Sequence, residues 1–154
     1  MNSHADEMAI RNLAAAYTDA INRRNAEEAA AVYAPDGTAC LDGGQVVPGD
    51  KMVKNFRNVL KNLPFVFQTT HSGIVEVNGD TARARWWLSE VQLFKDEAQY
   101  RFWAGTYEDE VVRLSHGWRF KQRRLTTHFT AVYGPGAQHM PAPVYQAVKS
   151  PTAP

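Results

Sequence analysis

The chain has 154 residues, a formal net charge of +1 at pH 7 and one cysteine, Cys40. This length suits a single domain with a substantial core, and the near-zero charge provides no field to attract nucleic acid or an anionic membrane. A lone cysteine excludes an internal disulfide and fits a reducing compartment. The N-terminus shows no signal peptide, and no window approaches the roughly 18 uninterrupted apolar residues of a membrane span. We therefore expect a cytoplasmic protein.

Two helices are predicted at the start of the chain. The first begins at Ser3, and its apolar residues recur every three or four positions as far as Asn22. Asn25 and Glu28 have the spacing of a capping box for a second helix. The run Ala34-Pro35-Asp36-Gly37 is expected to end that helix.

Residues 38–64 combine short strands with a third helix. Two strands, 38–41 and 45–47, are expected on either side of the Asp42-Gly43-Gly44 turn. Asp50 is expected to cap the third helix, which carries apolar residues on one side and lysine and arginine mostly on the other.

The stretch from Phe65 to Val132 has the pattern of four long strands. Turn signals at Asn78-Gly79-Asp80, Lys95-Asp96-Glu97 and Ser115-His116-Gly117 separate the four runs. Because such short connections join antiparallel neighbours, the strands are predicted to form a meander. Long strands twist and curve. We therefore predict an α+β fold, a cone-shaped barrel in which the three helices cover the concave face of a strongly curved antiparallel sheet.

Residues 1–133 are expected to form this single domain. After Tyr133 the composition changes to Gly134-Pro135-Gly136 and four further prolines. Proline at this density does not fit the interior of a sheet. Residues 134–154 are therefore expected to be a tail that is either disordered or wrapped over the domain or a neighbouring subunit.

Alternation within the predicted strands indicates a ligand pocket. Successive side chains of a strand face opposite sides of the sheet, so aromatic, apolar and polar residues share one face. The residues of this face are Trp86, Leu88, Glu90, Gln92, Trp103, Gly105, Tyr107, Arg123, Leu125 and Thr127. Such a face suits a largely apolar cavity in which a few polar groups orient a cyclic hydrophobic ligand. Alternation alone leaves open that Glu90 and Arg123 lie on the solvated outer face.

Of the five histidines, His71 is the one inside a predicted strand, ahead of an apolar alternation. It is either a buried, hydrogen-bonded imidazole or an acid–base group, which would require that it face the pocket beside a partner that fixes its tautomer. His128 lies at a strand end, and its facing stays open. The sequence has no His-x-His, cysteine pair or glycine-rich phosphate loop after a strand, so neither a metal nor a nucleotide cofactor is expected.

The order of segments and several short motifs resemble the SnoaL-like branch of the nuclear transport factor 2-like superfamily. The matching segments are 9–13 with Tyr17, 22–36, Thr70-His71, 77–82, Gly105-Thr106-Tyr107 and 117–120 with Arg123. This branch includes cofactor-free lyases and cyclases, among them scytalone dehydratase, hexachlorocyclohexane dehydrochlorinase and bile-acid 7α-dehydratase. The resemblance implies a histidine base that is oriented by an aspartate from the end of the first helix.

On this chain the resemblance assigns the base to His71 and the orienting position to Asn22. It assigns Tyr17 to a position held by Tyr or Lys, and Arg123 to a late-strand arginine. Asn22 departs from the family aspartate, and a neutral amide orients an imidazole without stabilising the imidazolium. Either Glu90 supplies the missing carboxylate, or a neutral histidine and the Tyr17 phenol polarise a carbonyl as hydrogen-bond donors.

The leading expectation is a cofactor-independent lyase or isomerase, of dehydratase or cyclase type, that acts on a hydrophobic cyclic molecule. In it His71 is the general acid or base, Asn22 orients its ring, and Tyr17 and Arg123 stabilise negative charge on an oxygen. The alternatives are a non-catalytic small-ligand binding or accessory protein, and an assembly subunit like the small subunit of ring-hydroxylating oxygenases. A homo-oligomer, dimer or trimer, is expected because an open sheet leaves a face and edges exposed.

Overall fold

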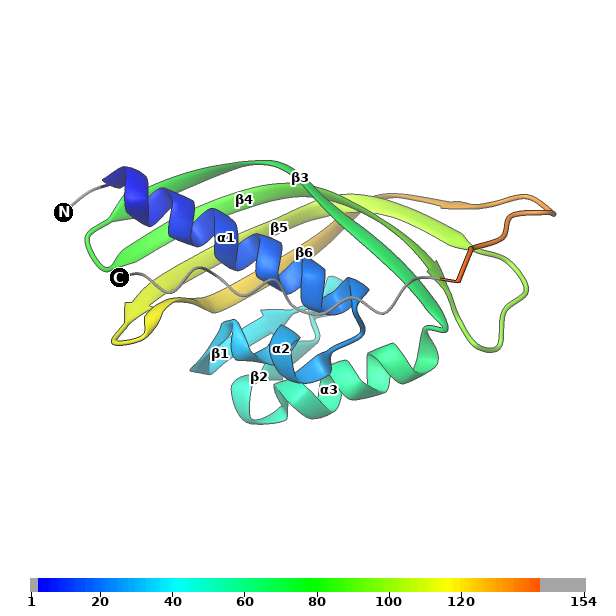
Figure 1. The fold of residues 1–154 in the computed structure, drawn as a ribbon, viewed down its shortest axis with the longest axis horizontal. Helices are drawn as coiled ribbons and strands as arrows, with labels where there is room; N and C mark the ends of the chain where they lie inside the picture. Colours follow the sequence, from blue (N-terminus) through cyan, green and yellow to red (C-terminus); the bar gives the residue numbers. More distant parts are fainter. Residues whose placement is uncertain (1–2, 142–154) are drawn as a thin grey trace.

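Helix α1 (Ser3–Asn22) lies across the concave side of a curved sheet in the computed structural model, which describes residues 3–141 (Figure 1). Its buried face is the predicted apolar stripe, from Ile10 to Ile21. Asn25 caps the short helix α2 (Ala26–Ala31), because its side-chain oxygen accepts from the Glu28 backbone N–H at 3.0 Å and its Nδ2 donates to Glu28 Oε1 at 2.9 Å. Asn25 is thus confirmed as the N-cap, but the reciprocal bond of a capping box differs, because the Asn25 backbone N–H donates to the Ala20 carbonyl oxygen and not to Glu28.

Six strands form one mixed sheet in the order β2-β1-β6-β5-β4-β3. They are β1 (Tyr33–Cys40), β2 (Val46–Pro48), β3 (Phe65–Asn78), β4 (Thr81–Leu93), β5 (Arg101–Leu114) and β6 (Gly117–Val132). The pairs β3–β4, β4–β5 and β5–β6 are antiparallel, so the predicted meander is confirmed. The predicted α+β class is confirmed as well, with one parallel pair, β1–β6, added to it.

Strand β1 corrects the prediction for residues 33–37. The sequence places the end of a helix there, but these residues are the first half of a strand beside β6. Its pairing with β6 shifts register between Tyr33 and Thr38, which accommodates the missing N–H of Pro35. A Cβ on Gly37 would lie 2.7 Å from the Phe120 carbonyl oxygen, so glycine permits the close approach of the two strands.

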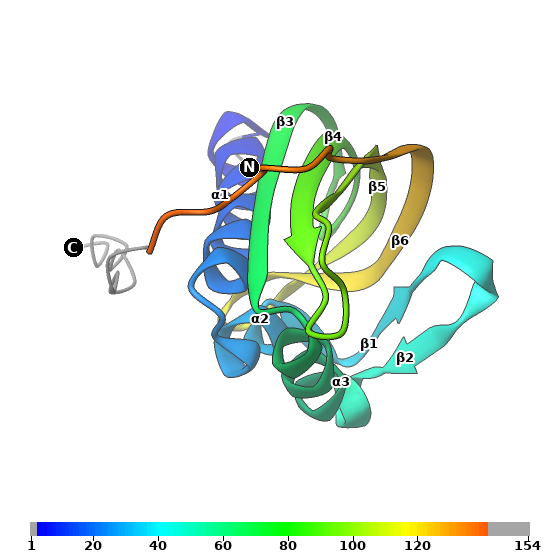
Figure 2. The same cartoon turned by 90° about the vertical axis from the view of Figure 1, so that its right-hand side faces the viewer.

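Helix α3 (Gly49–Asn62) closes one end of the cone together with α2, next to β1 and β2 (Figure 2). A single 3₁₀ turn, η1 (Asp42–Gly44), connects β1 to β2. The predicted cap at Asp50 is wrong, because Pro48 holds the N-cap position of α3. Asp50 lies inside the first turn, where its negative charge interacts favourably with the helix dipole. The buried face of α3 carries Met52, Phe56 and Leu60.

The two faces of the sheet differ sharply. The concave face and the helices enclose the hydrophobic core, which includes many aromatic residues. The convex face is uncovered within residues 3–141 and keeps large apolar side chains exposed. They include Phe67, Ile74, Trp87 and Phe129. The convex face therefore exposes more apolar surface than scattered single residues would.

Irregularities in the long strands decide which residues face inward. The β3–β4 register shifts between Thr70 and Gly73, so His71 and Ser72 together oppose one residue of β4, Trp87. This is a β-bulge, which locally reverses the phase of alternation. A Cβ on Gly73 would lie 2.1 Å from the Trp86 ring, so the strand approaches that indole closely.

The tail begins directly after β6. Residues 134–141 form no helix or strand, and His139 stacks on Phe65 with 4.6 Å between ring centroids. The Nδ1 atom of His139 shares a 2.6 Å hydrogen bond with the Tyr100 hydroxyl. The first part of the tail thus lies against its own domain, while the expectation for 142–154 concerns residues outside those described. None of the helices in residues 3–141 has the length and apolar character needed to cross a membrane.

Candidate functional site

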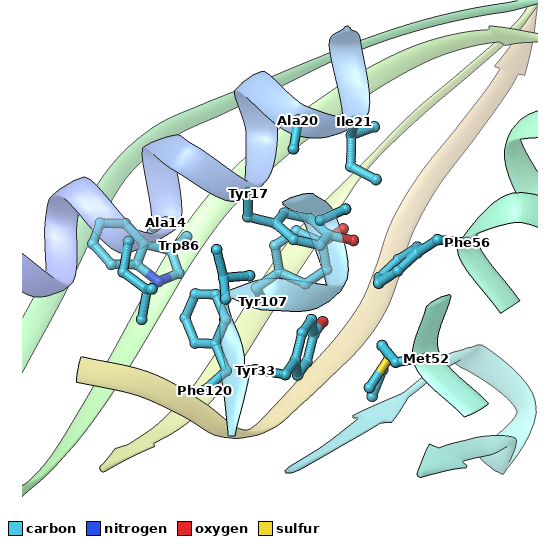
Figure 3. Close-up of a cluster of buried hydrophobic side chains, with 14 of the residues drawn as sticks. Ala14, Tyr17, Ala20, Ile21, Tyr33, Met52, Phe56, Trp86, Tyr107 and Phe120 are labelled. Atoms are coloured by element: carbon cyan, nitrogen blue, oxygen red, sulfur yellow. The ribbon is translucent and has the colours of Figure 1, made fainter. Parts of the chain in front are cut away.

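A cavity of about 1040 Å³ lies between α1, α3 and the concave face of β3–β6. Its wall is mostly apolar and aromatic, and Figure 3 shows Tyr17, Tyr107 and Phe56 gathered around one space. The exposed β4–β5 loop, residues 97–99, contributes to its rim. Pockets for drug-sized molecules span roughly 300–1,000 Å³. This cavity is therefore large enough for a polycyclic ligand.

Glu90 on β4 is the buried carboxylate of the cavity wall. Its side chain faces inward and the residue is 6% exposed. Gln68 Nε2 donates to its Oε2 at 2.8 Å, and Trp103 Nε1 donates to its Oε1 at 3.2 Å. Burial raises the pKa of Glu90 above its usual 4.5, although the hydrogen bonds from Gln68 and Trp103 act in the opposite direction. Both of its polar partners are neutral, so no cation fixes this carboxylate in its ionised form.

Gln68 on β3 lies between Glu90 and Tyr107. Besides its bond to Glu90, its Nε2 donates to the Tyr107 hydroxyl oxygen at 3.2 Å. Burial raises the pKa of Tyr107, and it does the same for Tyr17 on the facing helix. Both phenols therefore keep their protons at neutral pH and are available as hydrogen-bond donors.

Asn22 has a structural contact in place of the expected catalytic one. Its Nδ2 donates to the Gln68 carbonyl oxygen at 2.8 Å, and its Oδ1 accepts from the Gln68 backbone N–H at 2.7 Å. Both ends of the amide are thus used to fasten the end of α1 to β3. Asn22 does not line the cavity, and the inward-facing β3 side chain beside it is Gln68.

The prediction that His71 faces the pocket is wrong. The residue is exposed on the convex side of β3, where its Nε2 shares a 2.8 Å hydrogen bond with Ser89 Oγ. Inward-facing residues on this part of β3 are Val66 and Gln68, so position 71 has the opposite parity and lies in the bulge. No histidine lines the cavity in the described residues. His71 is therefore in no position to act on a ligand there.

Arg123 on β6 lies beneath the aromatic wall and is not free for a ligand. Its Nε and Nη2 donate to the two carboxylate oxygens of Asp109 at 2.8 and 2.7 Å, and both side chains are buried. The guanidinium is also 4.6 Å from the Tyr17 ring centroid and 4.2 Å from that of Tyr107. Burial would lower the pKa of Arg123, but the Asp109 charge outweighs this and raises it. The pair supports the two tyrosines from behind.

The remaining predicted pocket residues divide into two groups. Trp103, Tyr107 and Thr127 line the cavity together with Glu90 and Tyr17. Trp86 and Leu88 are buried in the core beside the cavity without lining it. Alternation left open that Glu90 and Arg123 lie on the solvated outer face, but both side chains are buried on the concave side.

Sequence reasoning missed Gln68 and Asp109. Asp109 shares the parity of Trp103 and Tyr107 on β5, so continuing that alternation by one step would have found it. Gln68 has a weaker sequence signal, because the family resemblance assigned His71 to the cavity, and residues three positions apart on a regular strand face opposite sides. Residues 3–141 contain no group of three or more His, Cys, Asp or Glu side chains able to hold a metal ion.

The match to known proteins agrees with this architecture. Residues 2–124 match the family model described as a SnoaL-like domain. The chain therefore belongs to the SnoaL-like domain family, as its motifs predicted.

Individual relatives extend this result. Uncharacterized proteins of Mycobacterium tuberculosis and Mycobacterium bovis are 30% identical over 130 residues, which cover 81% of this chain and 87% of theirs. Hexachlorocyclohexane dehydrochlorinase LinA-type3 from Novosphingobium barchaimii has a TM-score of 0.79 at 16% identity, over 90% of this chain and 96% of that one. A protein of Kribbella flavida gives a TM-score of 0.76 at 17% identity, over 84% and 95%. At these identities the solved structures show a common fold.

Replacing Arg123 with methionine is expected to reduce the free energy of unfolding by about 3–5 kcal/mol, because it leaves the Asp109 carboxylate buried without its cation. The matched control is Arg85→Met, which removes the exposed Arg85–Glu108 pair at 3.2 Å and should change stability by less than about 1 kcal/mol. Urea unfolding of both variants measures the difference. Equal decreases in the free energy of unfolding would show that the buried pair contributes no more to stability than the exposed one.

Glu90→Gln is expected to gain stability relative to wild type as pH rises. The folded-state pKa of Glu90 lies above 4.5, so the unfolded chain loses this proton first and wild-type stability falls from about that pH until the folded carboxyl has also ionised. The glutamine variant lacks this loss. Unfolding free energies at a series of pH values measure it, with the exposed Glu110→Gln as control. A difference that shrinks with rising pH would contradict the raised pKa.

Proposed function

We propose that this protein is a cofactor-independent lyase or isomerase that moves a proton on a hydrophobic cyclic molecule held in the cone. In this proposal Glu90 is the acid–base group, and the hydroxyls of Tyr17 and Tyr107 donate hydrogen bonds to an oxygen of the substrate. The proposal rests above all on one observation: a carboxylate on the wall of an apolar cavity whose polar partners are the neutral side chains of Gln68 and Trp103.

The chemistry follows from this environment. A partly desolvated carboxylate with a raised pKa is a stronger base than one in water. Glu90 takes a C–H proton next to a carbonyl, and the electron pair moves to the carbonyl oxygen, where the tyrosine donors stabilise the charge. Return of the proton to another carbon completes an isomerisation. Transfer of the same proton to a departing β-hydroxyl releases water and completes a dehydration, and both routes regenerate the carboxylate.

The fold shared with a dehydrochlorinase supports elimination chemistry in this cavity. The acid–base group proposed here differs from the histidine that the family resemblance implies. Glu90 reaches the cavity from β4, on the far side of Gln68 from helix α1. Glu90 therefore contacts no histidine, so in this proposal the carboxylate itself transfers the proton and does not orient an imidazole.

A second candidate is a binding protein that uses the same cavity without catalysis. Asn22 and Gln68 are both neutral amides, and Asn22 is fully occupied by the Gln68 backbone. In that case Glu90 orients a ligand by accepting a hydrogen bond and transfers no proton. The two candidates differ in whether proton exchange depends on Glu90.

Deuterium exchange into cyclic ketones tests the proposal without knowledge of the natural substrate. With 2-tetralone, 2-decalone and cyclohex-2-enone in D₂O, wild type should accelerate exchange at the carbon next to the carbonyl over buffer, followed by proton NMR. Glu90→Gln should lower this acceleration by roughly two to four orders of magnitude, the usual contribution of a general base.

His71→Gln is the matched control, because that side chain lies on the opposite face of the sheet. It should keep the wild-type rate. An unchanged rate in Glu90→Gln, or a lost rate in His71→Gln, would contradict the assignment. No exchange with any ketone would favour the binding protein.

We further propose that a second copy of the chain covers the convex face. Exposed Trp87 lies on this face beside Arg83 and Arg85, whose cross-strand partners on β5 are Glu110 and Glu108. Both signs of charge are therefore present in adjacent strands. A copy related by a twofold axis can set the arginines of one chain against the glutamates of the other while burying the apolar residues.

Sedimentation velocity tests this assembly. Wild type should sediment above the 17.3 kDa of one chain, and Trp87→Glu should shift it toward the monomer, because the change buries an unpaired charge in the contact. Met8→Glu, an exposed position on α1, should leave the distribution unchanged. A wild-type monomer at about 100 µM would contradict a stable contact, since its Kd would exceed the micromolar range.

A further inference from the structure

One polar atom of the cavity wall has no partner. The side-chain carbonyl oxygen of Gln68, Oε1, is buried and accepts no hydrogen bond from the protein. The residue lines the cavity and is 3% exposed. A ligand hydroxyl that reaches this oxygen would supply the hydrogen-bond donor that the protein itself does not provide.

The orientation of the Gln68 amide is fixed by its neighbours. Its nitrogen donates both to Glu90 Oε2 and to the Tyr107 hydroxyl oxygen, which uses both amide hydrogens. An ionised carboxylate only accepts hydrogen bonds, so turning the amide over would place two oxygens against each other. The carbonyl oxygen is therefore the end of Gln68 that is left for a ligand.

We propose that the ligand is a hydroxylated apolar ring, a phenol or cyclic alcohol, whose O–H donates to Gln68 Oε1. This inference names the substrate class for the function proposed above and rests on the same cavity. A ketone or hydrocarbon without a donor would leave Oε1 unsatisfied. The site thus favours ring compounds with a hydroxyl over otherwise equal molecules that lack one.

The surrounding groups agree with such a ligand. The Tyr107 hydroxyl accepts from Gln68, so its own hydrogen is left to donate either to the neighbouring Tyr17 hydroxyl or to a second oxygen of the ligand. Its oxygen lies 3.2 Å from the Gln68 nitrogen, which places an acceptor and a donor side by side on the wall. A ring that carries a hydroxyl near a carbonyl satisfies both. Such hydroxy ketones are also the compounds from which a base-assisted dehydration removes water.

Three probes of similar shape isolate the donor. Calorimetric titration of wild type with 2-naphthol, 2-methoxynaphthalene and naphthalene should give the tightest binding for 2-naphthol, by roughly tenfold over each of the others, the value of one well-made hydrogen bond. The methoxy compound accepts but does not donate, so it separates the donor from mere polarity. Equal or inverted affinities, or no binding of any probe, would overturn the inference with wild type alone.

Variants locate the acceptor. In Gln68→Met the preference for 2-naphthol over 2-methoxynaphthalene should fall to about one, whereas His71→Gln, whose side chain lies on the opposite face of the sheet, should retain it. Circular dichroism establishes that both variants fold. A preference kept in Gln68→Met, or lost in His71→Gln, would overturn the inference. Because these readouts are affinities, a preference without ketone exchange would refute the proposed catalysis alone, and exchange without a preference would refute the ligand class alone.

Discussion

The phase of side-chain alternation along β3 is the constraint on which the site depends. A strand presents every second residue to the same face, and on β3 the inward set contains Gln68 while His71 faces outward. The bulge after Thr70 changes this phase, and Gly73 then lies directly against Trp86. Because of this one extra residue, His71 faces away from the cavity, and the inward-facing side chain beside Asn22 is that of Gln68.

Two inward carboxylates have contrasting surroundings. Asp109 receives both arms of the Arg123 guanidinium and the Trp86 indole N–H, so its charge is compensated within the core. Glu90 receives two neutral donors and borders a cavity. A buried charge that is paired with a cation is held in one state, whereas one held by neutral donors exchanges its proton more readily. In the proposed function this difference makes Asp109 a structural acid and Glu90 the acid–base group, although both lie on the same concave face.

Membership of the SnoaL-like family does not transfer its chemistry to this chain, because a fold hosts several activities and the site decides among them. Both ends of the Asn22 amide are hydrogen-bonded to the β3 backbone, and the Gln68 side chain beside it faces the cavity. The carboxylate on the wall comes from the next strand of the sheet.

The sequence by itself determined the elements and their order. Helical stripes, the N-cap at Asn25 and the turn at Asn78-Gly79 depend on neighbours a few residues away, so they can be predicted from the local sequence. The exception was β1, where Pro35 and Gly37 signal a break, yet pairing with β6 imposes a strand.

Only the tertiary structure decided which residues meet in the cavity. Alternation along the strands placed Glu90, Trp103, Tyr107 and Thr127 there correctly, and the family resemblance placed Tyr17. The assignments of His71, Asn22 and Arg123 to the cavity were wrong. Their facing depends on a bulge, on a backbone contact between α1 and β3, and on a buried aspartate from another strand. Each of these is a contact between residues distant in sequence, and the free energy that selects it comes from packing the whole sheet against its helices.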